Sequence, residues 1–160
     1  MAGDVMFGRV ALIDGRGARL GELPVAHRGR DVAPLLARGI VPLAQPGTVI
    51  RRSVWEKLGG FDETYRVAGD LDFFVRAILA GARFEFAGAR VAAFRLSAGQ
   101  LSKRREEVEA ETRRALAPLA FAPRSLAALG RFRLGNLGVY LERVRRHGWV
   151  SMRDLYDRTG

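Results

Sequence analysis

The sequence predicts an α/β fold in which a mixed sheet has flanking helices and the C-terminal tail is helical. Three observations predict it: β-favouring apolar runs alternate with helical segments, two of these runs can form a hairpin, and glycines separate the segments. The chain has 160 residues, of which 48% are hydrophobic and 28% are charged. This composition is typical of a globular domain with a substantial core.

Residues 5–23 predict an antiparallel hairpin. The run VMFGRVALI favours a strand, Asp14-Gly15-Arg16-Gly17 has the composition of a turn, and ARLGEL can return alongside the first strand. Gly8 within the first run predicts a bulge or a close approach of another backbone. After a basic loop, we expect Asp31 to cap a short helix that continues through Ala37.

Residues 48–50, Thr-Val-Ile, predict a short buried strand. The next helix is expected to begin near Ser53, because Ser53 and Glu56 have the spacing of a capping box. It should end at Gly59-Gly60, since glycine commonly closes a helix.

A further helix is expected from about Asp70 to Ala80, where acidic residues open an apolar run that ends at Gly81. Residues 83–95 then predict one or two strands, broken at Gly88.

The last part of the chain predicts a polar loop at 97–102, a charged helix at 103–115, and a change of composition after the prolines at 118 and 123. Residues 125–146 have leucines near helical spacing, with arginines between them. We therefore divide the chain into a first part, residues 1–117, and a basic helical tail, residues 118–160.

The formal net charge of +10 at pH 7 suggests an anionic partner: nucleic acid, a membrane surface or a phosphorylated small molecule. The excess is almost entirely arginine, and GC-rich coding explains such an excess equally well. The arginines are scattered and are not interleaved with aromatic residues, so we expect no nucleic-acid partner.

Several classes of protein are excluded or disfavoured by composition. The chain has no cysteine, which excludes disulfides and thiolate metal sites. No apolar run approaches the roughly 20 residues that span a bilayer, and the first residues lack the pattern of a signal peptide. We expect a cytoplasmic location. Peripheral contact with the inner face of the membrane is compatible with it.

Residues 59–76, GGFDETYRVAGDLDFFVR, contain four carboxylates in a strongly basic chain: Asp62, Glu63, Asp70 and Asp72. Two carboxylates one residue apart could hold Mg²⁺ or Mn²⁺, or one of them could act as a general base. The competing interpretation is that Asp70 is the N-cap of a helix and Asp72 an acid of its first turn. Spacing alone favours this second interpretation.

The run from Ile50 to Arg76, IRRSVWEKLGGFDETYRVAGDLDFFVR, resembles the second conserved region of family 2 glycosyltransferases. The flanks 7–15, FGRVALIDG, and 91–102, VAAFRLSAGQLS, are similar to the segments before and after that region. The resemblance covers residues 5–115. It implies a partial GT-A-like fold and an inverting transfer from a nucleotide-sugar donor to a sugar or lipid-linked acceptor.

The resemblance also implies roles for individual acids. Asp70 matches the catalytic base of the family, which removes a proton from an acceptor hydroxyl. Asp72 would orient the helix start or contact the acceptor. The floor of the acceptor pocket would be shaped by Gly59-Gly60 and Phe61-Asp62-Glu63.

Arg95 lies where the family places a loop near the donor phosphates, and a guanidinium there would stabilise charge on the leaving diphosphate. Ser97 belongs to the same loop, at a position where relatives often have histidine. The resemblance thus implies substrate-binding roles for both residues.

A divalent cation, Mg²⁺ or Mn²⁺, is expected for the complete family domain, held by an Asp-x-Asp at the end of a buried strand. Asp70-Leu71-Asp72 has the same letters but precedes a helix, so we assign it to the acceptor side and expect no metal ligands in this chain. The resemblance begins in the second half of the family domain. We therefore expect weak or no activity alone, and association with a nucleotide-binding half or with a second copy.

The alternative is a small basic module that binds nucleic acid or an anionic membrane surface. Arg143, Arg145 and Arg146 lie beside Leu141 and Trp149, a pattern that predicts peripheral membrane contact through the tail. A helix that packs one face on the domain is the commoner outcome of such a pattern, and we prefer it modestly.

Overall fold

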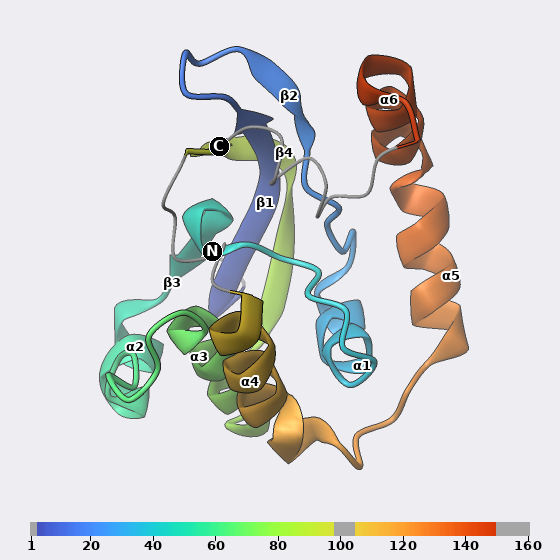
Figure 1. The fold of residues 1–160 in the computed structure, drawn as a ribbon. Coiled ribbons are helices and arrows are strands. Elements are labelled where there is room, and N and C mark those ends of the chain that lie inside the picture. Colours follow the sequence, from blue (N-terminus) through green and yellow to red (C-terminus); the bar gives the residue numbers. More distant parts are fainter. Residues whose placement is uncertain (1–2, 98–104, 150–160) are drawn as a thin grey trace.

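A computed structural model describes residues 3–97 and 105–149 of the chain (Figure 1). The elements are, in order, β1 (Val5–Ile13), β2 (Arg19–Glu22), α1 (Val32–Leu36), β3 (Thr48–Ile50), α2 (Arg52–Leu58), α3 (Gly69–Leu79), β4 (Phe84–Arg95), α4 (Arg105–Leu116), α5 (Leu126–Gly135) and α6 (Leu137–His147). Short 3-10 turns lie at 29–31, 45–47 and 117–119. Residues 98–102 of the predicted loop at 97–102, and residues 103–104 of the predicted charged helix, lie outside the described residues.

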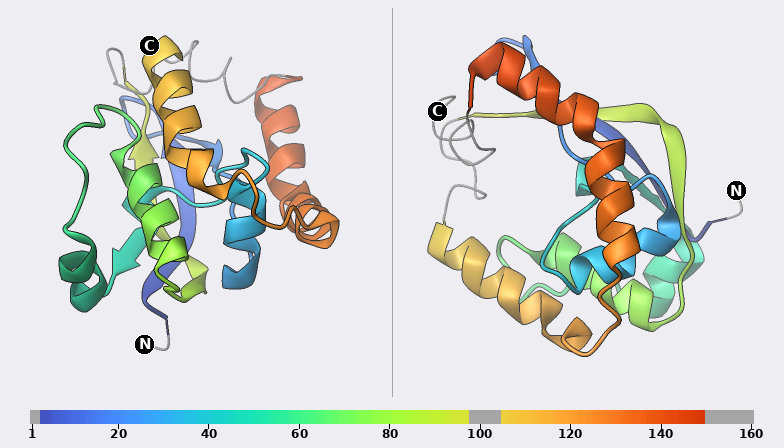
Figure 2. Two further views of the ribbon diagram at one scale, coloured as in Figure 1. Left: turned by 90° about the horizontal axis from the view of Figure 1, so that it is seen from below. Right: turned by 90° about the vertical axis from the view of Figure 1, so that its right-hand side faces the viewer.

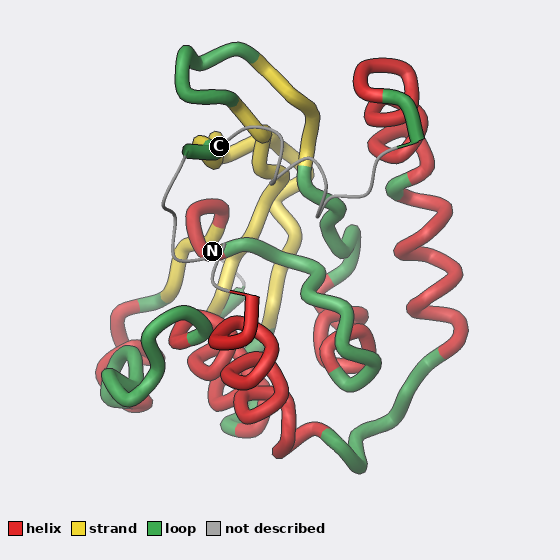
Figure 3. The backbone as a smooth tube through the Cα atoms, in the orientation of Figure 1, coloured by secondary structure: helices red, strands yellow, loops and turns green. Residues whose placement is uncertain are grey.

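Strand β1 is the centre of a four-stranded mixed sheet (Figure 3). β2 pairs antiparallel with the second half of β1 and β3 pairs antiparallel with its first half. β4 pairs with β1 in parallel along its whole length, from Val5 opposite Phe84 to Ile13 opposite Arg95. The prediction of an α/β fold with a mixed sheet and flanking helices is confirmed.

The predicted hairpin and the predicted irregularity at Gly8 are both present. Asp14 closes the β1–β2 turn, because its carboxylate accepts the backbone N–H groups of Arg16 and Ala18 at 2.8 Å each. The β1–β4 register shifts between Phe7 and Arg9. A Cβ on Gly8 would lie 2.7 Å from the methyl groups of Val91, so the close approach of β4 requires glycine there.

Helices α1 and α3 cover one face of the sheet, and α4 lies over α3 (Figure 2). Apolar side chains of the strands and of α1 and α3 form the main core, including Val5, Phe7, Leu35, Phe73 and Phe74. The 3-10 turn at 45–47 also contacts β1 and β4, while Val49 of β3 and Val91 of β4 are 50% and 48% exposed.

Asp31 occupies the predicted N-cap position of α1 but does not cap the helix through its side chain. Its side chain makes no cap hydrogen bond, and the residue is only 3% exposed. The carboxylate accepts two hydrogen bonds from the Arg131 guanidinium of α5, the one from Nε at 2.9 Å. This hydrogen bonding lowers the pKa of Asp31. A buried carboxylate requires such a partner, and here the partner is 100 residues away.

The predicted capping box is also wrong. The N-cap of α2 is Arg51, which makes no side-chain cap hydrogen bond, so Ser53 lies inside the first turn. The physical reason is that Arg51 is still extended and its N–H donates to the Asp4 carbonyl at 2.9 Å. β3 before it is half-buried or exposed, and the prediction of a buried strand is wrong in that respect. The predicted helix end is confirmed, since Gly59 is left-handed with φ 72°.

The helical stretch of the tail divides at Asn136 into α5 and α6. Asn136 is fully buried, and its Oδ1 accepts the N–H of Val25 at 3.0 Å. Its Nδ2 donates to the carbonyl oxygens of Val25 and Phe132 at 2.9 and 2.7 Å. A buried amide needs such partners, so this junction fixes both helices to the rest of the fold. No helix in the described residues is long and apolar enough to span a membrane.

Candidate active site

The loop between α2 and α3 is fixed to α3 by one arginine. Gly59 and Gly60 both have left-handed φ angles, 72° and 71°. The Arg76 guanidinium donates to the carbonyl oxygens of Leu58 and Gly60 at 2.7 and 2.8 Å, and its Nε bonds the Asp72 carboxylate at 2.7 Å. Asp72 therefore holds Arg76 in place, and through it the turn.

Three aromatic rings pack together at the first part of this loop. Trp55 of α2 packs on Phe61 and Phe73 with ring centroids 4.8 and 5.2 Å apart. Phe73 is fully buried, whereas Phe61 is 40% exposed at the surface of the loop. A Cβ on Gly60 would lie 2.9 Å from the indole, so glycine allows Trp55 to close over the turn.

Asp62 and Arg114 shape the middle of the loop. The Asp62 carboxylate accepts the N–H of Thr64 at 2.9 Å, and this backbone hydrogen bond lowers its pKa. The Arg114 guanidinium of α4 lies 3.8 Å from Asp62 and 3.9 Å from the centroid of the Tyr65 ring. These contacts connect the loop to α4.

Glu111 of α4 holds the end of the loop, a role that the sequence did not indicate. Its carboxylate accepts the backbone N–H groups of Arg66, Val67 and Ala68 at 2.9, 2.8 and 3.0 Å. These backbone hydrogen bonds lower the pKa of Glu111. Glu111 is one of several acids in a charged helix, and no local pattern distinguishes it from the others.

Asp70 lies in the first turn of α3, which begins at Gly69. The N-cap is Ala68, so the interpretation of Asp70 as N-cap is wrong. The Asp70 Oδ1 accepts the N–H of Leu71 at 2.8 Å. Burial of the carboxyl group disfavours its charged form and raises its pKa.

Two cavities meet at Asp70. The larger, of about 560 Å³, is lined by Gln45, Phe61, Asp62, Glu63, Tyr65, Arg66, Val67, Gly69 and Asp70. The smaller, of about 300 Å³, is lined by Leu23, Pro24, Val41, Leu43, Ala44, Gln45, Pro46, Asp70 and Phe94. Asp70 and Gln45 line both. The first cavity is rich in polar groups and the second is largely apolar.

The structure thus brings together Phe61, Asp62 and Asp70 among the residues expected from the sequence, whereas Gly60 is buried against Trp55 and does not line this cavity. Asp72 lines neither of these cavities. Glu63, which the sequence also placed at the pocket, lines the larger cavity, whereas Gln45, Tyr65 and Arg66 line it and were not expected from the sequence.

Arg95 and Ser97 lie elsewhere. The Arg95 guanidinium donates to the carbonyl oxygens of Asp14 and Gly15 at 3.1 and 2.8 Å, which supports the β1–β2 turn. Ser97 is half-buried at the end of the described segment 3–97. Neither residue lines the cavities at Asp70.

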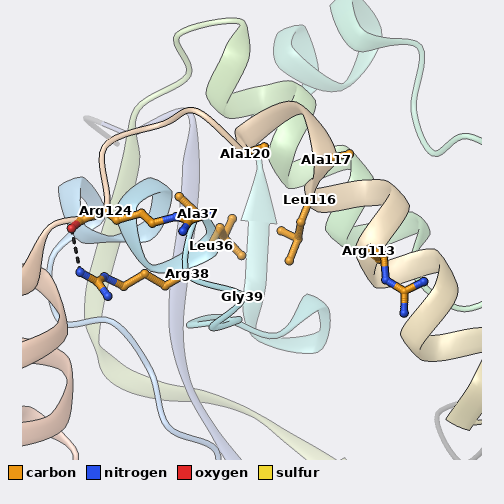
Figure 4. A pocket seen from close by; sticks show the side chains of 9 residues that line it. All are labelled: Leu36, Ala37, Arg38, Gly39, Arg113, Leu116, Ala117, Ala120 and Arg124. Atoms are coloured by element: carbon orange, nitrogen blue, oxygen red, sulfur yellow. Dashed lines mark hydrogen bonds between the residues drawn. The ribbon is translucent and has the colours of Figure 1, made fainter.

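A third cavity, of about 400 Å³, lies between α1, α4 and the segment that leads to α5 (Figure 4). It is lined by Leu36, Ala37, Arg38, Gly39, Arg113, Leu116, Ala117, Ala120 and Arg124. Arg38 donates to the carbonyl oxygen of Arg124 at 2.8 Å. This cavity contains none of the residues that the sequence placed in a site.

In residues 3–97 and 105–149, no three His, Cys, Asp or Glu side chains gather in a group that could hold a metal ion. Comparisons with protein-family models, with curated proteins and with solved structures found no match to this chain.

The raised pKa of Asp70 predicts a pH-dependent effect on stability. A carboxyl whose folded pKa lies above its unfolded value contributes stability that is present below the unfolded pKa, about 3.9, and is lost as the pH rises through the folded pKa. Asp70→Asn should therefore raise the free energy of unfolding at neutral pH and make little difference in acid. Urea denaturation of wild type and Asp70→Asn, at neutral pH and at a pH below the unfolded pKa, measures this difference in stability. A variant less stable than wild type at neutral pH would contradict the prediction.

Proposed function

We propose that this chain supplies the acceptor side of an inverting, nucleotide-sugar-dependent glycosyltransferase similar to family 2, with Asp70 as the general base. The observation that carries the proposal is the position of Asp70, a half-buried carboxylate with a raised pKa at the junction of two cavities. Perturbed carboxylates in concave sites are frequently functional.

In the proposed reaction, the Asp70 carboxylate accepts the proton of an acceptor hydroxyl. The acceptor oxygen forms a bond to the anomeric carbon of the donor sugar, while the bond from that carbon to the nucleotide diphosphate breaks. Attack occurs from the face opposite the leaving group, so the anomeric configuration inverts. A base is most effective when its pKa lies near the working pH, and burial of Asp70 moves its pKa in that direction.

The two cavities fit two parts of an acceptor. Asp62, Glu63 and Tyr65 line the larger cavity, and the polar groups of these residue types suit the hydroxyls of a sugar. The exposed ring of Phe61 offers an apolar surface beside them. The smaller cavity, lined largely by apolar side chains, suits the apolar portion of a lipid-linked acceptor.

The resemblance begins in the second half of the family domain, so we assign the donor and its cation to a nucleotide-binding half of that domain. The family resemblance implies Mg²⁺ or Mn²⁺ bound to the donor diphosphate in that half. The Arg95 guanidinium donates to two carbonyl oxygens of the β1–β2 turn. We therefore assign Arg95 no role in stabilising the leaving diphosphate.

The test is sugar transfer by this chain fused to, or mixed with, the nucleotide-binding half of a family 2 enzyme. Asp70→Asn should lower kcat/KM at least about a hundredfold, the usual effect of removing a general base. Asp4→Asn is the matched control, since Asp4 pairs with Arg51 and Arg83 and lines neither cavity. Equal transfer by wild type and Asp70→Asn would remove Asp70 as the base.

A further inference from the structure

Helices α5 and α6 present an apolar surface on the side that faces away from the fold. Ala128 and Phe132 of α5 are 0% and 7% exposed and pack inward. Leucines on the opposite sides of the two helices are 74%, 76%, 52% and 60% exposed, in the order Leu126, Leu134, Leu137 and Leu141. Isolated exposed leucines are ordinary, but four on two consecutive helices form a patch that requires an explanation.

Arginines accompany these leucines. Residues 118–149 contain six arginines and one glutamate. Arg131 and Arg146 are paired with Asp31 and Glu142. Arg133 and Arg145 are exposed and form no ion pair within the part of the chain that the structure describes. We call the surface formed by Leu126, Arg133, Leu134, Leu137, Leu141 and Arg145 the leucine–arginine face.

Helical spacing places these residues together on each helix. Arg133 and Leu134 lie two turns after Leu126, and Leu137, Leu141 and Arg145 follow one another at intervals of four. The right-hand view of Figure 2 shows both helices toward the viewer, and Figure 1 shows both at the right-hand edge of the fold. The two stretches therefore belong to one side of the molecule.

The inward side of the same helices is tied to the fold. Arg19 bonds the Glu142 carboxylate at 2.7 Å, and the His147 ring lies 2.8 Å from the Leu20 carbonyl oxygen. Asn136 is bonded to both backbone groups of Val25. The leucine–arginine face is thus presented on anchored helices and cannot turn inward without breaking these contacts.

We propose that the leucine–arginine face docks on an anionic membrane surface. Basic amphipathic helices bury their apolar side at the boundary of headgroups and acyl chains, while their cations contact lipid phosphates. The net positive charge of the chain favours an anionic lipid surface over a second copy of the chain as the partner. A second copy of the chain would carry the same +10 charge to the contact, whereas an anionic lipid surface neutralises it. Trp149, 95% exposed just after α6, adds a side chain that favours the interface.

The test is sedimentation of the full chain with phosphatidylcholine vesicles and with mixed phosphatidylcholine–phosphatidylglycerol vesicles. Binding should require the anionic lipid. Replacing Leu134 and Leu141 together with serine should weaken it at least about tenfold, because two leucines no longer enter the apolar layer. Arg133→Gln and Arg145→Gln should each weaken it about fivefold. Leu79→Ser is the matched control, since Leu79 is 58% exposed on α3, outside this face.

Three results would overturn the proposal. One is the absence of binding to anionic vesicles at low salt. A second is binding that the paired leucine variant leaves unchanged, which would indicate attraction by net charge without docking of this face. The third is a dimer in analytical ultracentrifugation that the leucine variant dissociates, which would make the face an interface between two copies. None of these results depends on Asp70, so the proposed transferase role stands or falls separately.

Discussion

Replacing Phe73 with alanine is expected to lower the free energy of unfolding by about 3–5 kcal/mol, the range for truncating a buried phenylalanine. Phe73 is fully buried, and its ring contacts those of Trp55, Phe61 and Phe74. Since the free energy of unfolding of a domain is only about 5–15 kcal/mol, this substitution should remove a large part of it. Urea denaturation followed by far-UV circular dichroism measures it.

Phe121→Ala is the control for Phe73→Ala, because the Phe121 side chain is fully exposed and its loss should change stability by less than about 0.5 kcal/mol. Phe73→Leu retains much of the apolar volume and should cost less than Phe73→Ala. If Phe73→Ala and Phe121→Ala had similar effects, the aromatic contacts of α2 and α3 would not support the core as described.

Asn136→Ala should lower the free energy of unfolding by about 2–4 kcal/mol, because it leaves two buried backbone groups of Val25 without their partners. The carbonyl oxygen of Phe132 keeps another donor, the N–H of residue 136 itself. Because Asn136 joins α5 and α6 to the fold, hydrogen exchange should show the greatest loss of protection in these two helices.

Two variants make the test of Asn136 specific. Leu137→Ala changes the neighbouring residue, which is 52% exposed, and should have an effect within about 0.5 kcal/mol. Asn136→Asp places a carboxylate against the carbonyl oxygens of Val25 and Phe132, so it should be destabilising at neutral pH and partly recover as the acid protonates. Uniform loss of protection across all elements in Asn136→Ala would contradict the local role of this junction.

The local elements of the fold were largely predictable. Asp14 and the glycines of its turn specify the β1–β2 hairpin, and Gly59 ends α2 with the left-handed geometry that glycine favours. The helix caps were predicted less well. Asp31 and Ser53 have the residue types and spacing of caps, but ion pairing and sheet extension placed them in other roles. Cap patterns are weak signals because tertiary contacts compete for the same polar groups.

Some residues of the candidate site were likewise predictable from the sequence, and others were not. The acid density of residues 59–76 indicated Asp70, and the structure places Phe61 and Asp62 at the same cavity. Gln45 and Tyr65 also line it, and no periodicity marked them. Glu111 fixes the loop before Asp70 from 43 residues away along the chain, a contact that only packing of α4 on the loop creates.

The sequence by itself determined the elements whose signals are local: the hairpin, the helix ends at glycine, the apolar run of α3 and the acid cluster before it. Tertiary structure decided the parallel pairing of β4 with β1, the burial of Asp31 against Arg131, and the division of the tail at Asn136. The physical reason is distance along the chain. A local pattern reports the preferences of neighbouring residues, whereas these contacts depend on partners that approach only when the core of the domain has formed.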